Sequence, residues 1–250
     1  MRDDFILIIP ARLESTRLPK KLLIKIEGLS IIQRTYNCAL NALKDKEKII
    51  IATDSELLFN HCKEFGANVI KTSKDCLTGT DRVAEVSERI NAKQYINLQG
   101  DEPIFPPEDL NSFINEAIKK PEEIHTAITK IRSDVDYRNL SIPKMVFTKS
   151  KRLLYSSRAP IPSNKKGEFK LGFKHVCVYA FNKTHLKEFK NFGGKAFFEN
   201  LEDLEINRFL ELDFIVNCVE LKYGGKAVDT KNDLEIVKKI ITTNQSSLSF

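Results

Sequence analysis

The sequence lacks the features that mark membrane proteins, secreted proteins and zinc-stabilised domains. No apolar run approaches the roughly eighteen residues that a membrane span needs, so we expect no membrane insertion. The five cysteines are odd in number and never form a CxxC pair, which argues against structural zinc and for reduced thiols in the cytoplasm. Acidic residues, and not a basic region, precede the first apolar run, so a secretory signal is not expected.

The net charge and the distribution of basic residues narrow the class of molecule that the protein could bind. The formal net charge of +6 suits either nucleic acid or a small polyanionic substrate. However, the basic residues are spread along the chain, and no basic block is interleaved with aromatic residues. Internal repeats and low-complexity segments are also absent. We therefore expect a small substrate and no nucleic acid; a nucleic-acid-binding protein is an alternative that depends on net charge alone.

The first half of the chain alternates apolar strands with amphipathic helices. A length of 250 residues suits one compact α/β unit, or one unit with a smaller lobe. Apolar residues from Ile32 to Leu43 recur at the spacing of one helix face. The pattern predicts strands over 5–9, 48–52, 67–70 and 95–98 and two more helices over 55–65 and 81–90. This order favours a mostly parallel sheet with helices on both faces.

From about residue 123 the pattern changes. Strands are predicted over 125–131, 145–147 and 175–181, and an exposed, mobile arm over 151–171. A helix over 200–211, a strand over 215–221, a helix over 232–242 and a frayed tail from 244 follow. We predict a single domain, 1–250, with halves of about 1–122 and 123–250, in which the second half extends the sheet in a mixed manner.

A basic loop follows the first predicted strand. Residues 10–21 contain Arg12, Arg17, Lys20 and Lys21 and no glycine, so side chains must supply the positive charge. Arginine binds phosphate oxygens in a bidentate manner, and lysine acts as a point charge. A basic loop is often only a solvated turn. Its position at the carboxyl end of a strand in a parallel sheet, where ligands collect, favours phosphate binding instead.

Two acids follow apolar segments in the same way that the basic loop follows the first strand. Asp101 leaves the strand predicted over 95–98, and Asp229 follows an apolar stretch and precedes the last helix. Mg²⁺ is typically held by one or two carboxylates together with substrate phosphates. Asp229 could instead cap the helix that follows it. Two acids near several cations favour phosphoryl or nucleotidyl transfer with Mg²⁺.

Two other loops leave alternatives open. Asp54 could contact a ribose, but capping of the next helix is the favoured interpretation. In the stretch "TGTDR", Gly79 permits close backbone approach and Thr80 could cap a helix. Arg82 could hold a base or a phosphate, or it could be an exposed arginine on a capped helix. The residues alone do not separate these possibilities.

The motifs "IIPARLESTRLPKK", "TGTDR", "NLQGDEP", "HVCVYAF" and "VDTKNDLE" occur in this order over residues 5–238. Together they resemble the 3-deoxy-manno-octulosonate (Kdo) cytidylyltransferase family, also called CMP-Kdo synthetases. The resemblance implies a Rossmann-like nucleotidyltransferase fold, with a mostly parallel central sheet and a smaller extension for sugar binding and dimerisation. It also implies a cytoplasmic homodimer that uses CTP and Mg²⁺ to activate Kdo for lipopolysaccharide biosynthesis.

The resemblance assigns roles at matching positions. Nucleotide binding falls to Pro10, Ala11, Arg12, Arg17, Lys21, Thr80, Arg82 and Gln99. The resemblance also implies four catalytic residues, which stabilise charge as pyrophosphate leaves: Arg12, Arg17, Lys21 and Asp101. Mg²⁺ would be held by Asp101 and Asp229. Sugar binding falls to Gln99, Arg158, Lys165, His175, Tyr179, Glu205 and Ile206.

The sequence departs from the family pattern at four positions. Lys20 and Cys177 replace glycines, Lys165 stands where an arginine is expected, and Ile206 replaces a glutamine. Three of these departures lie on the sugar side, so another acidic sugar, such as 8-amino-Kdo or a nonulosonic acid, is an alternative substrate. A non-catalytic nucleotide-binding protein is a further alternative, although it would not need the complete phosphate and metal set. No residue stands out as a general base.

Overall fold

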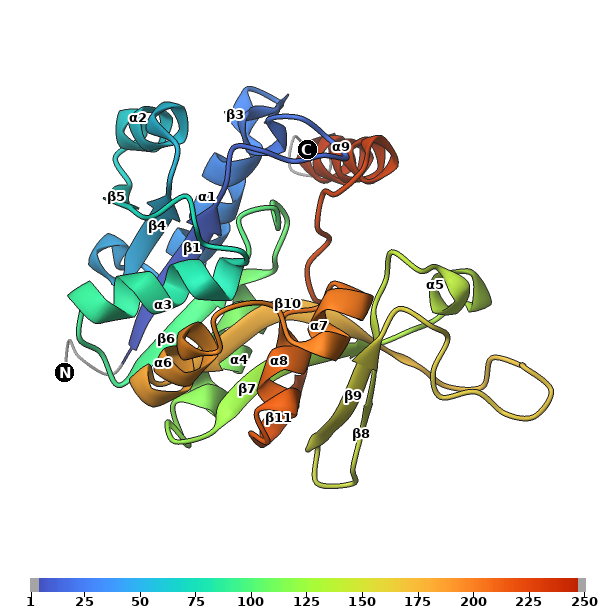
Figure 1. Cartoon of the computed structure of the whole chain (residues 1–250). Helices are drawn as coiled ribbons and strands as arrows, with labels where there is room; N and C mark the ends of the chain where they lie inside the picture. Colours follow the sequence, from blue (N-terminus) through green and yellow to red (C-terminus); the bar gives the residue numbers. More distant parts are fainter. Residues whose placement is uncertain (1–4, 247–250) are drawn as a thin grey trace.

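The computed structural model describes residues 5–246, and its centre is a nine-stranded sheet (Figure 1). Seven strands lie side by side in the order β11-β7-β10-β6-β1-β4-β5. Their bounds are β1 (Phe5–Ala11), β4 (Ile49–Thr53), β5 (Asn68–Lys71), β6 (Gln94–Leu98), β7 (Ile124–Lys130), β10 (Phe173–Phe181) and β11 (Val216–Glu220). Strand β10 runs antiparallel to its neighbours β6 and β7, whereas the other pairs in this row are parallel. The predicted fold class, a mostly parallel sheet with a mixed extension, is confirmed.

Helices cover both faces of the sheet. Their bounds are α1 (Ile31–Leu43), α2 (Glu56–Glu64), α3 (Gly79–Arg89), α4 (Pro107–Ala117), α5 (Asp134–Arg138), α6 (Lys183–Asn191), α7 (Phe197–Glu202), α8 (Ile206–Glu211) and α9 (Lys231–Ser246). In β1, Leu7 and Ile9 belong to the core cluster that includes α1 and α4, while Ile8 belongs to the cluster that includes α3, α6 and α8. Successive strand side chains point to opposite faces, which explains the uninterrupted apolar run at the start of the chain.

A pair of strands, β8 (Lys144–Phe147) and β9 (Leu153–Ser157), projects from one end of the sheet (Figure 1). The pair joins the main sheet where Lys144 of β8 lies opposite Lys174 of β10. The prediction of an exposed, mobile arm over 151–171 is therefore wrong for its first part, which contains strand β9. Residues after Ser157 do form a long loop, which extends outward beside α5 in Figure 1.

The predicted helix over 200–211 is in fact two helices. The chain breaks at Asp203, whose backbone is left-handed with φ of 52°. Helix α9 continues to Ser246, so the first part of the predicted tail is helical, and residues 247–250 lie outside the described range. Helices α4, α5 and α6 and the small hairpin of β2 (Lys25–Ile26) and β3 (Leu29–Ser30) were not predicted.

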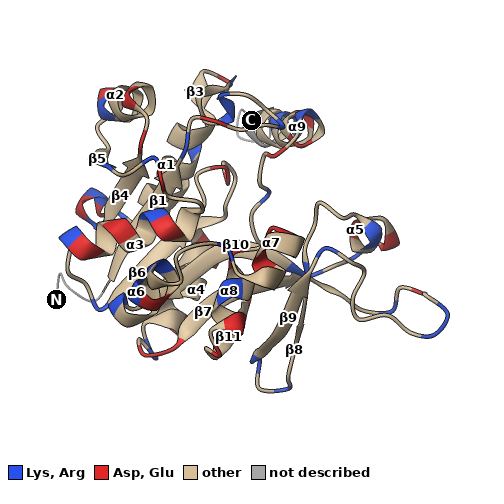
Figure 2. Cartoon of the chain, in the orientation of Figure 1, with Lys and Arg blue, Asp and Glu red and all other residues tan. Residues whose placement is uncertain are grey.

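The apolarity of the helices and the distribution of charge are relevant to which partners the protein could bind. Within the described range, no helix is long and apolar enough to cross a membrane. Figure 2 shows Lys and Arg on many separate elements, among them α2, α3, α6, α8 and the loop beside α5. This distribution agrees with the spread of basic residues along the sequence.

Candidate active site

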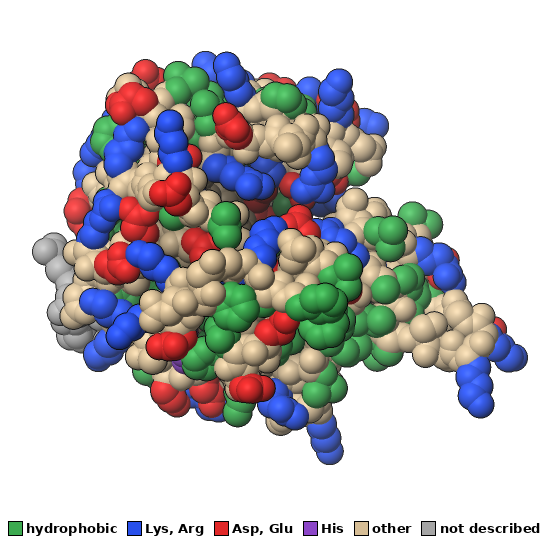
Figure 3. Space-filling model, viewed as in Figure 1, with side chains coloured by type: hydrophobic (Ala, Val, Ile, Leu, Met, Phe, Trp, Pro, Cys, Tyr) green, Lys and Arg blue, Asp and Glu red, His purple; other side chains and the backbone are tan. Residues whose placement is uncertain are grey.

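A cavity of about 770 Å³ opens where the parallel strands β1 and β6 end. Figure 3 shows this face of the molecule hollowed near its middle, with acidic and basic side chains around the hollow. Most of the residues predicted for the site line the cavity: Pro10, Ala11, Arg12, Arg17, Lys21, Arg82, Gln99, Asp101, Arg158, His175, Tyr179, Glu205 and Asp229. The structure therefore gathers residues from both halves of the chain around one space.

Local packing explains why the basic loop and the first acid meet. A Cβ atom on Gly100 would lie 2.8 Å from the carbonyl oxygen of Pro10, so only glycine lets the loop after β6 pass so close to β1. The backbone amide of Val228 donates a 2.9 Å hydrogen bond to the carbonyl of Asp101. This bond brings the second acid, Asp229, beside the first.

The ammonium of Lys21 lies between the two acids. Its Nζ atom is 2.5 Å from Asp101 Oδ2 and 2.8 Å from Asp229 Oδ1, and Arg17 Nη2 lies 3.1 Å from the same Asp229 oxygen. Burial opposes the charged form of the lysine, but the two carboxylates outweigh it and raise the pKa of Lys21. The site thus has a permanent cation that both acids contact.

The neighbouring lysine has a different environment. Lys20 is exposed, does not line the cavity, and has a left-handed backbone with φ of 51°. Its positive φ accounts for the glycine that the family pattern has at this position. Arg12 is exposed at the cavity wall, where it can reach a ligand.

The two acids offer a suitable environment for a hard divalent cation. They already converge on one positive group, and a carboxylate pair supplemented by substrate phosphates is the usual protein contribution to a Mg²⁺ site. Among the residues that the structure describes, no group of three or more His, Cys, Asp or Glu side chains is placed to hold a metal. Helix α9 is capped by Thr230, whose Oγ1 accepts from the amide of Asp233, so Asp229 keeps its carboxylate for the cavity.

The start of helix α3 forms another wall of the cavity. Thr78 and Asp81 make a capping box, and a Cβ atom on Gly79 would lie 2.8 Å from the side chain of Gln99. Arg82 is buried, donates to Thr72 and lies 3.5 Å from Asp54. Arg82 is therefore not the exposed arginine of the simpler interpretation.

Asp54 does not cap helix α2, contrary to the favoured prediction. The side chain of Ser55 accepts from the amide of Leu58 and caps this helix instead. Asp54 faces Arg82, and its side chain is partly buried, with an exposure of 22%. The aspartate thus helps to hold the arginine that lines the cavity.

Gln99 and Glu205 meet at the base of the cavity. The Gln99 amide donates a 2.7 Å hydrogen bond to Glu205 Oε1, and the backbone amide of Thr80 donates a 2.9 Å bond to Oε2. Burial raises the pKa of Glu205, while the hydrogen bonds from Thr78 and Thr80 partly offset it. Thr80 itself is buried and its side chain is outside the cavity lining.

Strand β10 presents five residues to the cavity. His175, Cys177 and Tyr179 all line it, together with Lys174 and Val176, because the pairing with β7 is irregular between Val176 and Tyr179. His175 lies 3.1 Å from the Thr126 hydroxyl, and burial lowers the pKa of His175 to about 3, with Arg158 adding a smaller effect. His175 is therefore a neutral hydrogen-bonding group at neutral pH.

Two residues predicted to bind the sugar do not reach the cavity. Lys165 lies on the exposed loop after β9. Ile206 is fully buried and packs in the apolar cluster between the sheet and α8, because the chain breaks at Asp203 just before it. In this structure neither side chain contacts the space that a ligand would occupy.

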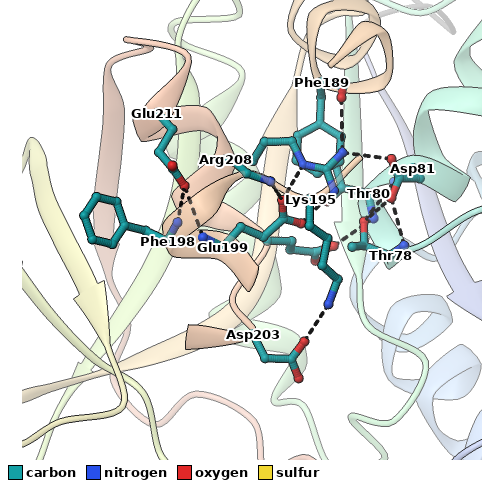
Figure 4. A network of polar contacts seen from close by, with 12 residues as sticks. Thr78, Thr80, Asp81, Phe189, Lys195, Phe198, Glu199, Asp203, Arg208 and Glu211 are labelled. Atoms are coloured by element: carbon teal, nitrogen blue, oxygen red, sulfur yellow. Dashed lines mark hydrogen bonds and ion pairs between the residues drawn. The ribbon is translucent and has the colours of Figure 1, made fainter. Parts of the chain in front are cut away.

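Sequence patterns also missed a buried ion network beneath the cavity wall (Figure 4). Arg208 forms a bidentate pair with Glu199 at 2.6 Å for both bonds and contacts Asp81 at 3.1 Å. Its guanidinium also lies 3.7 Å from the centroid of the Phe189 ring. An arginine inside the apolar pattern of α8 is the signal that could have revealed it.

Glu102 is a second buried acid that was not predicted. It lines the cavity beside Asp101, and a Cβ atom on Gly225 would lie 2.0 Å from its Oε2 atom. Burial, and then the neighbouring charge of Asp101, raises the pKa of Glu102. The glycine at 225 is what allows this carboxyl group to pack there.

The comparisons with known proteins agree with this geometry. Residues 6–216 match the family model "Cytidylyltransferase". The 3-deoxy-manno-octulosonate cytidylyltransferase of Elusimicrobium minutum is 36% identical over 250 residues, which cover 96% of this chain and 99% of the relative. The enzyme of the same name from Chloroherpeton thalassium is 37% identical, with 94% and 97% of the two chains covered.

A solved structure leads to the same family. The CMP:2-keto-3-deoxy-manno-octonic acid synthetase complexed with CTP superposes with a TM-score of 0.87 and 32% identity, over 96% of this chain and 99% of that one. Both the overall fold and the sequence are therefore shared with these proteins. The chain belongs to the 3-deoxy-manno-octulosonate cytidylyltransferase family.

Proposed function

We propose that this protein transfers the CMP group of CTP to Kdo and releases pyrophosphate, for use in lipopolysaccharide biosynthesis. The observation that carries the proposal is the convergence of Lys21, Asp101 and Asp229 at the ends of the sheet strands. The family relation supports the choice of CTP and Kdo, because the relatives carry the corresponding names.

The proposed reaction is an in-line displacement at the α-phosphorus of CTP. The oxygen of the sugar's anomeric hydroxyl forms the new bond to the α-phosphorus, and the hydroxyl proton passes to solvent. The bond from the α-phosphorus to the oxygen that bridges it to the β-phosphorus breaks, and pyrophosphate leaves with both electrons of that bond. Arg12, Arg17 and Lys21 would hold the triphosphate and stabilise the charge that develops on the leaving group. Arg82 and Gln99 line the wall at which the rest of the nucleotide would lie.

We propose that Asp101 and Asp229 hold Mg²⁺ together with the phosphates of CTP. The metal would neutralise phosphate charge and lower the pKa of the attacking hydroxyl. Lys21 contacts both acids before the substrate arrives, so its ammonium keeps them close together despite their like charges. The same ammonium is then within reach of phosphate oxygens bound at this place.

The sugar is proposed to bind between β10 and the segment that carries Glu205. Arg158 would pair with the carboxylate of the sugar, while His175 and Tyr179 exchange hydrogen bonds with its hydroxyls. The low pKa of His175 supports this assignment, because a neutral imidazole both donates and accepts. Lys165 and Ile206 have no part in this proposal.

We also propose that the protein acts as a cytoplasmic homodimer. An exposed apolar face on α7 and β9 supports this, since large exposed apolar patches mark interaction sites. The apolar face consists of Leu154, Tyr155, Phe197, Phe198 and Leu201. Figure 3 shows hydrophobic side chains gathered over these elements. The five free thiols support a reducing compartment.

Pyrophosphate release, measured with each nucleoside triphosphate against a panel of acidic sugars, tests the proposed reaction. We expect turnover only with CTP and Mg²⁺, and the highest kcat/KM with Kdo among Kdo, 8-amino-Kdo and nonulosonic acids. Light scattering on wild type and Leu201→Glu tests the dimer, and we expect the variant to be a monomer. Equal turnover with several nucleotides, or a wild-type monomer, would contradict the respective proposal.

A further inference from the structure

Lys144 is a lysine with no exposed surface, at the junction of β8, β9 and β10. Fully buried lysines are rare, because the charged form loses its hydration unless other groups replace it. Here the replacement comes from backbone carbonyls. The ammonium donates to the carbonyl oxygens of Asn139 at 3.1 Å and Ile142 at 2.8 Å, and to that of Arg158.

These three carbonyls belong to two different segments of the cavity wall. Asn139 and Ile142 lie in the turn after α5, and Arg158 follows β9; all three residues line the cavity, whereas Lys144 does not. A lysine ammonium has three hydrogens, so one group satisfies three acceptors at once. The ammonium therefore fastens the turn to the backbone of Arg158 from behind the wall.

The guanidinium of Arg158 depends on the same turn. Its Nη1 atom donates to the carbonyl of Leu140 at 3.2 Å, inside the segment that Lys144 holds. Its Nε atom donates to the carbonyl of Glu202 at 2.6 Å, and the Glu202 carboxylate accepts from the Arg158 amide at 2.8 Å. Lys144 thus fixes both the backbone of Arg158 and one acceptor of its side chain.

We propose that Lys144 is a positioning residue for Arg158, and that it acts on the affinity for the acidic sugar without contacting that sugar. The inference rests on the proposed function, in which Arg158 pairs with the sugar carboxylate. Without the ammonium, the turn and the end of β9 lose their common donor. The guanidinium then loses the fixed Leu140 carbonyl that holds Nη1, and it keeps the carbonyls of Glu202 and Asp203 as acceptors. The nucleotide-binding loop at residues 10–21 has no part in this arrangement, so the effect should be confined to the sugar.

The test compares Lys144→Met with Lys149→Met in the full chain, using steady-state kinetics. The first change removes the ammonium but keeps an unbranched side chain, and the second removes an exposed lysine from the turn between β8 and β9. We expect Lys144→Met to raise the KM for Kdo about tenfold or more, while the KM for CTP stays within about twofold. Lys149→Met should match the wild type in both constants.

A double-mutant cycle separates positioning from a general loss of structure. If Lys144 acts through Arg158, the variant with both Lys144→Met and Arg158→Met should have the same sugar KM as Arg158→Met alone. The inference would be overturned if the two substitutions multiplied their effects on the sugar KM. It would also be overturned if Lys144→Met raised the KM for both Kdo and CTP. If Lys144→Met fails to fold, Lys144→Gln, which retains an amide donor, takes its place with a smaller expected effect. Failure of both to fold would reject a positioning role.

The outcomes for the inference and for the proposed function are distinguishable. If the wild type releases no pyrophosphate with CTP and Kdo, the proposed function fails. If the wild type is active and a folded Lys144→Met variant keeps the wild-type sugar KM, only the inference fails.

Discussion

The side-chain amide of Gln99 donates a 2.7 Å hydrogen bond to the carboxylate of Glu205. Gln99 directly follows the central strand β6, and Glu205 immediately precedes helix α8, so the bond joins the two halves of the chain at the base of the cavity. The same carboxylate accepts from the amide of Thr80 at the start of α3. One acid therefore connects the strand end, the nucleotide-side helix and the segment proposed to face the sugar.

The two adjacent lysines of the basic loop should differ sharply in their effect on catalysis. Lys21→Ala removes the cation that contacts both acids, and we expect kcat to fall by roughly 100-fold or more, the scale for one preorganised charge-stabilising group. Lys20→Gly, the matched control, should leave kcat unchanged and raise the melting temperature slightly, because glycine tolerates the left-handed backbone. Equal losses of kcat in both variants would contradict the assignment.

Arg208 should matter for stability because its charge is buried. Arg208→Met leaves Glu199 and Asp81 without their shared cation in the network of Figure 4. Breaking a buried ion pair from one side typically costs about 3–5 kcal/mol. We expect a loss of this size in urea unfolding, whereas Arg138→Met, which removes an exposed arginine paired with Asp134, should leave the free energy of unfolding nearly unchanged. Similar losses of unfolding free energy in both variants would show that the buried network contributes no more to stability than an exposed ion pair.

Low pH should destabilise the protein, partly because it favours protonation of His185. Burial lowers the pKa of His185 to about 4, below its ordinary value of 6.5, so the unfolded chain binds the proton first. The stability contributed by the neutral ring is complete above pH 6.5 and decreases as the pH falls toward 4, by about 1.4 kcal/mol per pH unit. His185→Gln keeps an acceptor for the capping box of α6 and removes the titration.

The measurement is the melting temperature between pH 7.5 and 5. We expect a shallower decline in His185→Gln than in the wild type. The decline should not vanish, because burial also lowers the pKa of His125 and of His175. Parallel curves for the two proteins would exclude His185 as a contributor.

Sugar choice should depend on Cys177 and not on Ile206. Cys177 lines the cavity between His175 and Tyr179, where the family pattern has glycine, so Cys177→Gly should change the ratio of kcat/KM for Kdo and 8-amino-Kdo, with the KM for CTP unchanged. Ile206→Gln places an amide in the apolar core and should instead cost about 1–3 kcal/mol of stability. If Ile206→Gln changes the ratio of kcat/KM for Kdo and 8-amino-Kdo, the side chain at position 206 does determine sugar specificity.

The strand ends and the residues that follow them could be predicted from the sequence. Lys21 and Asp101 each come shortly after an apolar strand, and parallel strands bring such positions to one edge of a sheet. Lys144 and Arg208 could not be predicted in this way. The Lys144 ammonium contacts backbone carbonyls, which every residue has, and Arg208 pairs with Asp81, which is 127 positions away. The family resemblance assigned Ile206 to the sugar, and neither it nor the helical pattern reveals the break at Asp203, after which Ile206 packs in the core.

The proposal that Lys21, Asp101 and Asp229 form the reaction centre is tested most directly by pyrophosphate release from CTP and Kdo as Mg²⁺ is varied. Wild type, Asp101→Asn, Asp229→Asn and the control Asp213→Asn, an exposed acid outside the cavity, are compared after thermal melts show that each is folded. We predict Mg²⁺-dependent turnover in the wild type and the control, and a loss of roughly 100-fold or more in kcat for each of the other two at saturating Mg²⁺. Wild-type turnover in folded Asp101→Asn or Asp229→Asn would contradict the account.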